Sequence, residues 1–234
     1  MVRDELLASI ANVNSAKYFA IRLSSQDRWR LFQAFKDRAV YLDIETCSVG
    51  QPHMEITVVG LYDGKTSRAF INGQNLNDLE VALADYDCVI TFNGTLFDLP
   101  VIQRLMPHVE LPALHIDLRF VLRLLGIKGG LKKIEKQFGV HREPEIVGLD
   151  GWDAERLWLA YQAGDAAALE TLVAYNKADI VNLEPLMQMA YASLAARCGK
   201  KHQTSEQLPA TSVFSPKSAD ENNEEIHKKD EESD

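Results

Sequence analysis

Apolar and polar residues alternate along residues 39–45, and two acids, Asp43 and Glu45, occupy alternate positions among the apolar ones. Side chains on a strand point to opposite faces in turn, so this pattern predicts a strand with one apolar face. The other apolar β-type segments are 56–62, 67–71 and 88–92. Asp63-Gly64 is a strong signal for a hairpin turn between the first two of these.

Helical spacing of apolar positions covers most of the remaining chain. The predicted helices are 4–12, 25–37, 76–84, 99–106, 117–125, 130–138, 152–163 and 166–197. Pro185 is expected to break the last of them. Strands that come first, with an early hairpin, and then alternate with helices predict an α/β fold. Its mixed central sheet would begin as an antiparallel hairpin, continue with parallel strands and be flanked by helices.

Composition divides the chain into three parts. Residues 199–234 are rich in Ser, Glu, Asp, Lys and Asn and poor in apolar side chains. Such a segment buries too little surface to offset the entropy of ordering, so we expect a disordered acidic tail. The expected domains are therefore a helical extension at 1–37, an α/β domain at 38–198 and this tail.

The chain has 234 residues, of which 46% are hydrophobic, enough for a real core. No apolar stretch approaches the ~20 residues of a membrane helix, and the first residues are polar where a secretory signal would be apolar. The three cysteines, Cys47, Cys88 and Cys198, have no paired spacing. We therefore expect a cytoplasmic protein with no membrane partner.

The net charge of −9 argues against a nucleic-acid binder that relies on bulk positive charge. Nine acids and five lysines from Lys200 to Asp234 account for −4, which leaves −5 for residues 1–199. An enzyme that holds phosphates through bound metal ions can itself be acidic, because the ions reverse the local field. Charge alone therefore does not decide between these classes.

Four acidic residues are predicted to lie at positions where a negative charge is energetically unfavourable. Asp43 and Glu45 share one strand face, about 7 Å apart, which is unfavourable unless a cation or a proton lies between them. Asp98 follows the segment 88–92, where it could also cap the next helix. Asp179 falls inside the apolar stripe of the late helix, and Tyr175, one turn earlier, could hydrogen-bond it in the core.

Convergence of these four carboxylates would cost several kcal/mol of repulsion in a partly buried site. Mg²⁺ or Mn²⁺, which prefer oxygen ligands, would remove that repulsion. Two such ions about 4 Å apart form the clamp used for in-line displacement at phosphorus. The acids therefore predict a site for two metal ions.

Three segments carry a family resemblance: "DIET" at 43–46, "FNGTLFDLP" at 92–100 and "YNKAD" at 175–179. In this order they resemble the three motifs of the ribonuclease H-like, DEDD-type 3′→5′ exonucleases, and Tyr175 is typical of the tyrosine subtype. The Asn93–Asp98 spacing is similar to that of the proofreading domain of family-B DNA polymerases. The stretch 115–140 and the Gly-Trp segment after it resemble the YprB-type predicted exonucleases. The likeness covers roughly residues 39–190.

The resemblance implies a ribonuclease H-like fold and a role for each motif residue. Asp43 would bridge both metals, Glu45 and Asp179 would hold the metal that carries the attacking water, and Asp98 would support the second. Tyr175 would orient that water or help to deprotonate it. The implied reaction releases a nucleoside monophosphate from the 3′ end of single-stranded DNA or RNA.

Substrate contacts are predicted for a second set of residues. Asn93 would contact the substrate or stabilise the Asp98 loop. Lys132 and Arg142 belong to the cluster of basic residues at 128–142, which could guide a phosphate backbone or simply be a solvated helix face. Thr46, beside Glu45, completes this set.

Other interpretations remain open. The fold could serve as a catalytically silent nucleic-acid-binding module, or the same acids could serve an endonuclease or a phosphatase. His115 and Asp117 could add metal ligands. The simpler interpretation is that Asp117 caps the following helix and His115 ends a buried strand.

Overall fold

A five-stranded mixed sheet lies at the centre of the computed structural model, which describes residues 2–48 and 53–200. The strand order is β3-β2-β1-β4-β5. The strands are β1 (Ala39–Cys47), β2 (Glu55–Tyr62), β3 (Ser67–Ile71), β4 (Cys88–Thr91) and β5 (Leu114–Asp117). β1, β2 and β3 pair antiparallel, whereas β4 and β5 run parallel to β1. The predicted α/β architecture, with an early hairpin followed by parallel strands, is confirmed.

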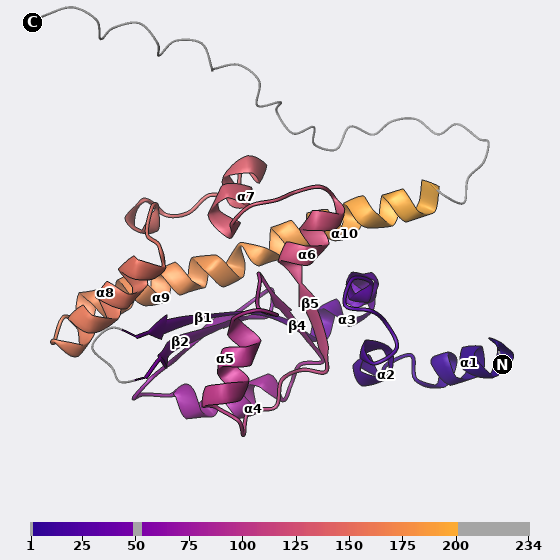
Figure 1. Ribbon diagram of the computed structural model, residues 1–234, viewed down its shortest axis with the longest axis horizontal. Helices are drawn as coiled ribbons and strands as arrows, with labels where there is room; N and C mark the ends of the chain where they lie inside the picture. Colours follow the sequence, from indigo (N-terminus) through magenta and orange to yellow (C-terminus); the bar gives the residue numbers. More distant parts are fainter. Residues whose placement is uncertain (1, 49–52, 201–234) are drawn as a thin grey trace, which may run out of the picture. The chain divides into compact units, whose positions relative to one another are not determined.

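Helices fill most of the remaining described chain (Figure 1). The α-helices are α1 (Val2–Ala11), α2 (Ala16–Ala20), α3 (Phe32–Phe35), α4 (Leu79–Leu83), α5 (Asp98–Leu105), α6 (Leu118–Leu124), α7 (Leu131–Phe138), α8 (Gly151–Gln162), α9 (Ala166–Val181) and α10 (Leu183–Lys200). The 3₁₀ turns are η1 (Arg28–Leu31), η2 (Lys36–Arg38), η3 (Leu76–Asp78) and η4 (Pro144–Ile146).

The expected location, tail and domain division concern the whole chain, of which the structure describes residues 2–48 and 53–200. In the part of the chain that is described, no helix combines the length and apolarity needed to cross a membrane; a cytoplasmic location stays a prediction. The predicted tail lies, from residue 201 on, outside the described residues. The division into three domains stays a prediction as well.

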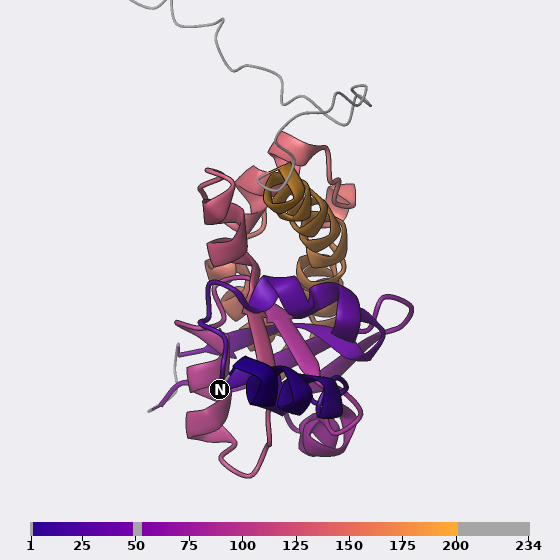
Figure 2. The same cartoon turned by 90° about the vertical axis from the view of Figure 1, so that its right-hand side faces the viewer.

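The two faces of the sheet pack against different helices (Figures 1 and 2). Val40, Leu42 and Ile44 of β1 join a core with α4 and α5 on one face. On the other face, Tyr41 and residues of β4 and β5 pack against α6 and α10. Asp43 and Glu45 alternate with the first set, so they face the side covered by α9, which contacts both β1 and β2.

The predicted single helix over 25–37 is wrong: this segment consists of η1, α3 and η2. Trp29, Phe32 and Phe35, spaced three residues apart, are all buried in the core with β4, β5 and α10. Trp29 lies in η1, whereas Phe32 and Phe35 lie in α3. These short elements together turn the three aromatic side chains into one core without forming a single regular helix.

The long helix predicted over 166–197 is divided at Asn182, between α9 and α10. Pro185 then lies in the first turn of α10, where its missing N–H removes no helical hydrogen bond. Leu172, Ile180 and Leu183 of the predicted apolar stripe are buried. Burial of this stripe packs α9 and α10 against the sheet and thereby places Asp179 beside it.

Gly60 on β2 lets α9 approach the sheet closely. It pairs with Asp43 across β1 and β2. A Cβ atom at this position would lie 2.1 Å from Oδ1 of Asn176 and 3.0 Å from Cδ1 of Ile180, both on α9. Real Cβ contacts are never as short as the first of these distances. The missing side chain of Gly60 therefore determines how closely α9, which carries Asp179, approaches the sheet.

We predict that Gly60→Ala destabilises the protein by about 1–3 kcal/mol, the usual cost of forcing extra volume into a packed contact. The measurement is urea unfolding monitored by circular dichroism. Gly151→Ala at the start of α8 is the matched control, because no atom lies within 4 Å of its added Cβ. Equal stability of the two variants would contradict the close approach of α9.

Candidate metal centre

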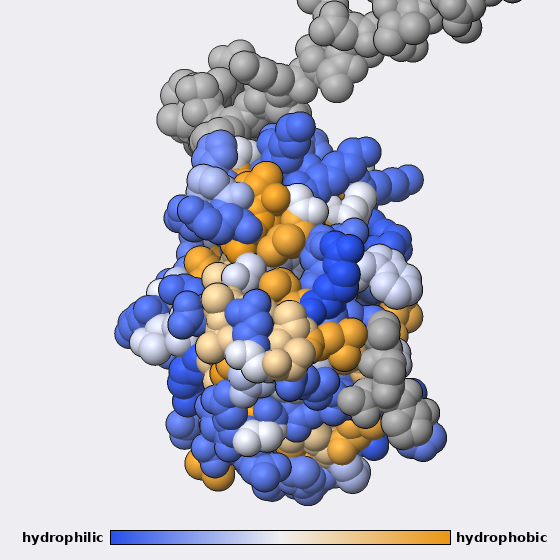
Figure 3. Space-filling model, turned by 90° about the vertical axis from the view of Figure 1, so that its left-hand side faces the viewer, coloured by the Kyte–Doolittle hydropathy of each residue, from blue (hydrophilic) through white to orange (hydrophobic). Residues whose placement is uncertain are grey.

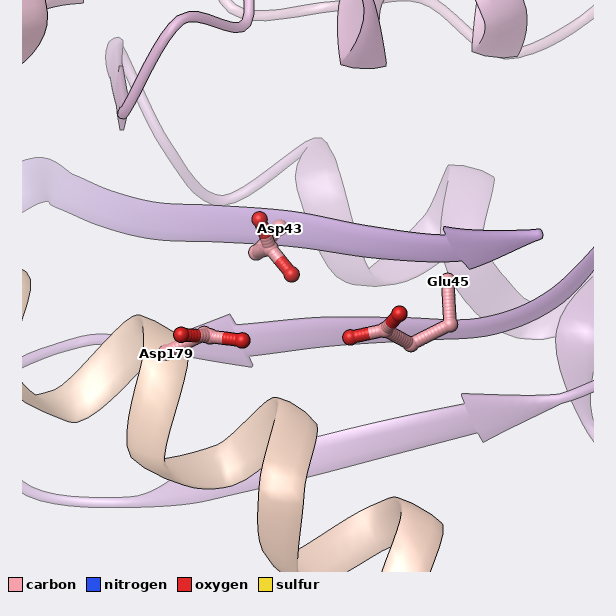
Figure 4. A group of neighbouring side chains, drawn as sticks. All are labelled: Asp43, Glu45 and Asp179. Carbon is pink, nitrogen blue, oxygen red and sulfur yellow. The ribbon is translucent and has the colours of Figure 1, made fainter. Parts of the chain in front are cut away.

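Three carboxylates from two distant parts of the chain meet on the α9 face of the sheet. Asp43 and Glu45 come from β1 and Asp179 from α9, and each contributes an oxygen that lies within 4.8 Å of the other two (Figure 4). Glu45 and Asp179 are buried and Asp43 is half-buried. Figure 4 shows the three side chains pointing toward one another across the gap between strand and helix.

The electrostatics of this group favour the binding of a positive charge. Burial raises the pKa of Glu45 to about 8, and the neighbouring Asp179 carboxylate adds to the rise. Burial also raises the pKa of Asp43 well above its ordinary value, with further contributions from Asp98, Asp179 and Glu45. Like charges held this close disfavour their own ionised forms, so a cation among them would relieve the cost.

Asp98 lies beside this group and outside it. Its carboxylate accepts a hydrogen bond from the backbone N–H of Ile44, at 3.1 Å, between the two acids of β1. Phe97, and not Asp98, occupies the N-cap position of α5, so the capping interpretation of Asp98 is wrong. Burial raises the pKa of Asp98 to about 7, and its charge in turn raises the pKa of Asp43.

Tyr175 is buried one helical turn before Asp179 and pairs with a lysine. Its hydroxyl accepts a hydrogen bond from Nζ of Lys132 at 2.9 Å, and Lys132 also donates to the carbonyl of Leu149. Burial raises the pKa of Tyr175 above its ordinary value, and the carboxylates of Asp179 and Glu45 raise it further. The phenol is therefore protonated at neutral pH.

Asp179 is paired with Arg142. Nη2 of Arg142 lies 2.5 Å from Oδ1 of Asp179, and the side chains are 6% and 10% exposed. Burial raises the pKa of Asp179, and Arg142 opposes that rise. Lys132 and Arg142, which were predicted to contact substrate, thus bind residues of the centre. The pairs Lys132–Tyr175 and Arg142–Asp179 replace the Tyr175–Asp179 hydrogen bond considered from the sequence.

Asn176 is a member of the site that sequence reasoning missed. Its Nδ2 donates to Oδ2 of Asp43 at 3.1 Å and to the carbonyl of Asp43 at 3.4 Å. Asn176 also lowers the pKa of Glu45 against the other contributions. The available signal was the position of Asn176 within "YNKAD", next to Tyr175, in a helix whose buried face already carried an acid.

The loop before Asp98 is held by Asn93 and Asp117. Asn93 adopts a left-handed backbone conformation, with φ of 71°, which is uncommon for a residue other than glycine. Its backbone N–H donates to Asp117 at 2.9 Å, and that of Thr95 donates to the same carboxylate at 3.0 Å. Arg119 donates to the side-chain oxygen of Asn93. Asn93 therefore contributes to the stability of the Asp98 loop.

His115 and Asp117 lie outside the three-carboxylate group. Asp117 caps α6 by accepting a hydrogen bond from the N–H of Arg119 at 3.1 Å. His115 does not end its strand, because β5 continues to Asp117. The imidazole shares a hydrogen bond of 2.9 Å with the hydroxyl of Thr91, and burial lowers its pKa to about 4. These hydrogen bonds therefore explain the positions of His115 and Asp117 without a metal ion.

Thr46 follows Glu45 at a shift in the register of β1 and β2. Such bulges are frequent next to active sites. Thr46 and Glu45 line a cavity of about 560 Å³ together with Phe97 and Trp152. Trp152, at the start of α8, is 73% exposed. Figure 3 views the molecule from the side on which α8 and the end of β1 lie, where apolar residues are gathered among polar ones.

A divalent cation fits the donors of the centre. Asp43, Glu45 and Asp179 offer only oxygen atoms, which suit Mg²⁺ and Mn²⁺. The raised pKa values of Glu45 and Asp43 reflect the free-energy cost of ionising these buried acids, which such an ion would remove. The arrangement can therefore hold a metal ion at the crossing of β1 and α9.

Residues 40–191 match the RNase_H_2 family, described as the RNase_H superfamily. Among curated proteins, none matches the sequence. The family B DNA polymerase of Pyrobaculum calidifontis is similar in structure, with a TM-score of 0.50 and 17% identity over 68% of this chain. The match spans only 28% of the polymerase, so the likeness concerns the fold of one part of that enzyme.

Two nucleases give lower scores. Brucella melitensis NrnC with bound Mg²⁺ has a TM-score of 0.48 and 20% identity, over 73% of this chain and 80% of NrnC. Escherichia coli RNase D, an exoribonuclease involved in structured RNA processing, has a TM-score of 0.46 and 19% identity, over 77% of this chain and 49% of its own.

We predict that Mn²⁺ at about 100 times its dissociation constant stabilises the protein by about 2.7 kcal/mol, or roughly 5–10 °C in melting temperature. Glu45→Gln removes a ligand, and because the pKa of Glu45 is raised to about 8, the neutral glutamine resembles the protonated acid of the metal-free protein at neutral pH. It should therefore abolish the metal response without lowering the melting temperature in chelator. The measurement is thermal unfolding in EDTA and in rising Mn²⁺, with the exposed Asp85→Asn as control. A full metal response in Glu45→Gln would contradict the assignment of this ligand.

Proposed function

Because the chain belongs to the RNase_H superfamily, we propose that it is a metal-dependent 3′→5′ exonuclease. Its substrates would be the 3′ ends of single-stranded DNA or RNA, from which it would release nucleoside monophosphates. One observation carries the proposal: Asp43, Glu45 and Asp179 converge to within 4.8 Å from motifs far apart in the chain. A further support is that these motifs resemble those of the DEDD exonucleases of the tyrosine subtype.

The proposed cofactors are two Mg²⁺ or Mn²⁺ ions. Asp43, Glu45 and Asp179 would hold one, and Asp98, whose charge acts on Asp43, would support the second. When bound, such ions acidify a water molecule and neutralise charge that develops on the phosphate.

Tyr175 would position the reacting groups and would not act as a base. Its raised pKa keeps the phenol protonated at neutral pH. Because the hydroxyl oxygen accepts a hydrogen bond from Lys132, its own O–H is free to donate a hydrogen bond to the oxygen of the attacking water or to the phosphate, without transfer of the proton. Lys132 thereby fixes the direction of that donation.

The cavity beside Glu45 would receive the terminal nucleotide. Phe97, directly before α5, and Trp152, on α8, line it, and exposed aromatic faces are suited to stacking on bases of any sequence. Thr46 lies in the same cavity and is the member of the predicted substrate-binding set best placed to contact this nucleotide.

We predict stepwise shortening of 5′-labelled single-stranded DNA or RNA in Mg²⁺ or Mn²⁺, followed on denaturing gels, and no shortening in EDTA. Asp43→Asn should lower the rate by about 100-fold or more, the scale of losing one preorganised electrostatic contact at a reacting phosphate. Asp85→Asn, exposed and remote from the centre in sequence, should retain full activity.

The same gels separate the alternatives. Binding without cleavage under every metal condition would indicate a silent nucleic-acid-binding module. Internal cuts would indicate an endonuclease, and release of phosphate from a monoester alone would indicate a phosphatase. Any of these three results would contradict the proposed exonuclease.

A further inference from the structure

We propose that Arg142 is a positioning residue that holds Asp179 in its metal-binding orientation, as part of a clamp with Glu135. This inference rests on the proposed function, because it assigns a role in metal binding at the same site. It also changes the expected role of Arg142 from a contact with the substrate backbone to a contact with a ligand of the centre.

The clamp is a chain of buried hydrogen bonds from α7 to α9. Nε and Nη2 of Arg142 donate to the two oxygens of Glu135, both at 2.7 Å. Nη2 also donates to Oδ1 of Asp179 at 2.5 Å. Asn182, after the end of α9, donates to Oε1 of Glu135 at 3.0 Å. The Arg142 and Glu135 side chains are 6% and 3% exposed, so the network is shielded from solvent.

Within the clamp, the negative charge of Glu135 faces the positive charge of Arg142. A lone guanidinium this close to the centre would repel a divalent cation. The bidentate contact with Glu135 offsets part of that charge, and the planar fork of arginine suits such a contact. Arg142 still acts on Asp179 both as a positive charge and as a hydrogen-bond donor. What the fork adds beyond charge is a fixed direction for the hydrogen bond to the Asp179 carboxylate.

A fixed orientation matters because Asp179 is the ligand that comes from the helix. The carboxylates of all three ligands can rotate about their side-chain bonds, and the hydrogen bond from Arg142 restricts that rotation for Asp179. Occupying Oδ1 leaves Oδ2 as the oxygen for a metal. Hydrogen bonds to ligating groups typically contribute 10–100-fold in metal affinity.

The same segment supports Tyr175. Lys132, on α7, donates to the Tyr175 hydroxyl, and Arg142, in the loop after α7, donates to Asp179. Residues 131–142 therefore contact both members of the "YNKAD" segment that the proposed reaction uses. This explains why two basic residues are turned inward from a cluster that the sequence suggested would face solvent or substrate.

The test is the dissociation constant of Mn²⁺ for the full chain, measured by isothermal titration calorimetry. Glu135→Gln/Arg142→Gln removes one charge of each sign, so the net charge is unchanged while the fork is lost. We expect its dissociation constant to rise about 10–100-fold, with melting temperature in EDTA and near-ultraviolet circular dichroism reporting an intact fold. Lys136→Gln, exposed on the same helix, is the matched control and should bind Mn²⁺ as the wild type does.

Arg142→Lys gives a second measurement that does not depend on folding of the double variant. It keeps the positive charge but cannot bridge both carboxylates in one plane, so the dissociation constant should also rise. An unchanged Mn²⁺ dissociation constant in the folded double variant or in Arg142→Lys would contradict the proposed role of Arg142. The proposed function would be unaffected by that result. Failure of the wild type to bind Mn²⁺ would overturn both.

Discussion

The structure depends on the burial of like charges where a strand and a helix cross. Asp43 and Glu45 are fixed by the alternation of β1, and Asp179 is brought to them by the apolar stripe that packs α9 and α10 onto the sheet. Gly60 permits this crossing because its missing side chain leaves room for Asn176. Hydrophobic packing thus stabilises an arrangement that electrostatics alone would disfavour.

Neutral and positive donors reduce that cost at Asp43, at Asp179 and at the neighbouring Asp98. Asn176 donates to Asp43, Arg142 donates to Asp179, and the N–H of Ile44 donates to Asp98. The pKa values of Asp43 and Glu45 nevertheless stay raised, so these contacts do not balance the charge. The remaining imbalance is what a bound divalent cation would compensate, and the proposed catalysis would follow from it.

Short-range patterns predicted much of this arrangement. Alternation identified β1 and its acids, and helical spacing placed Asp179 on a buried face. The Asp63-Gly64 turn indicated the hairpin. The contacts of Arg142 with Glu135 and Asp179 were beyond reach, because they join a loop to two helices through pairings that no local period encodes. The 3₁₀ turns around Trp29 were missed because their three-residue spacing resembles that of an amphipathic helix.

The central claim is that Asp43, Glu45 and Asp179 bind a divalent metal ion directly. Crystals grown or soaked in MnCl₂, with diffraction recorded near the manganese absorption edge, test it by the position of the anomalous signal. The account predicts a strong peak in direct coordination with oxygens of all three carboxylates. Anomalous peaks confined to surface carboxylates, with none between β1 and α9 at millimolar Mn²⁺, would contradict it.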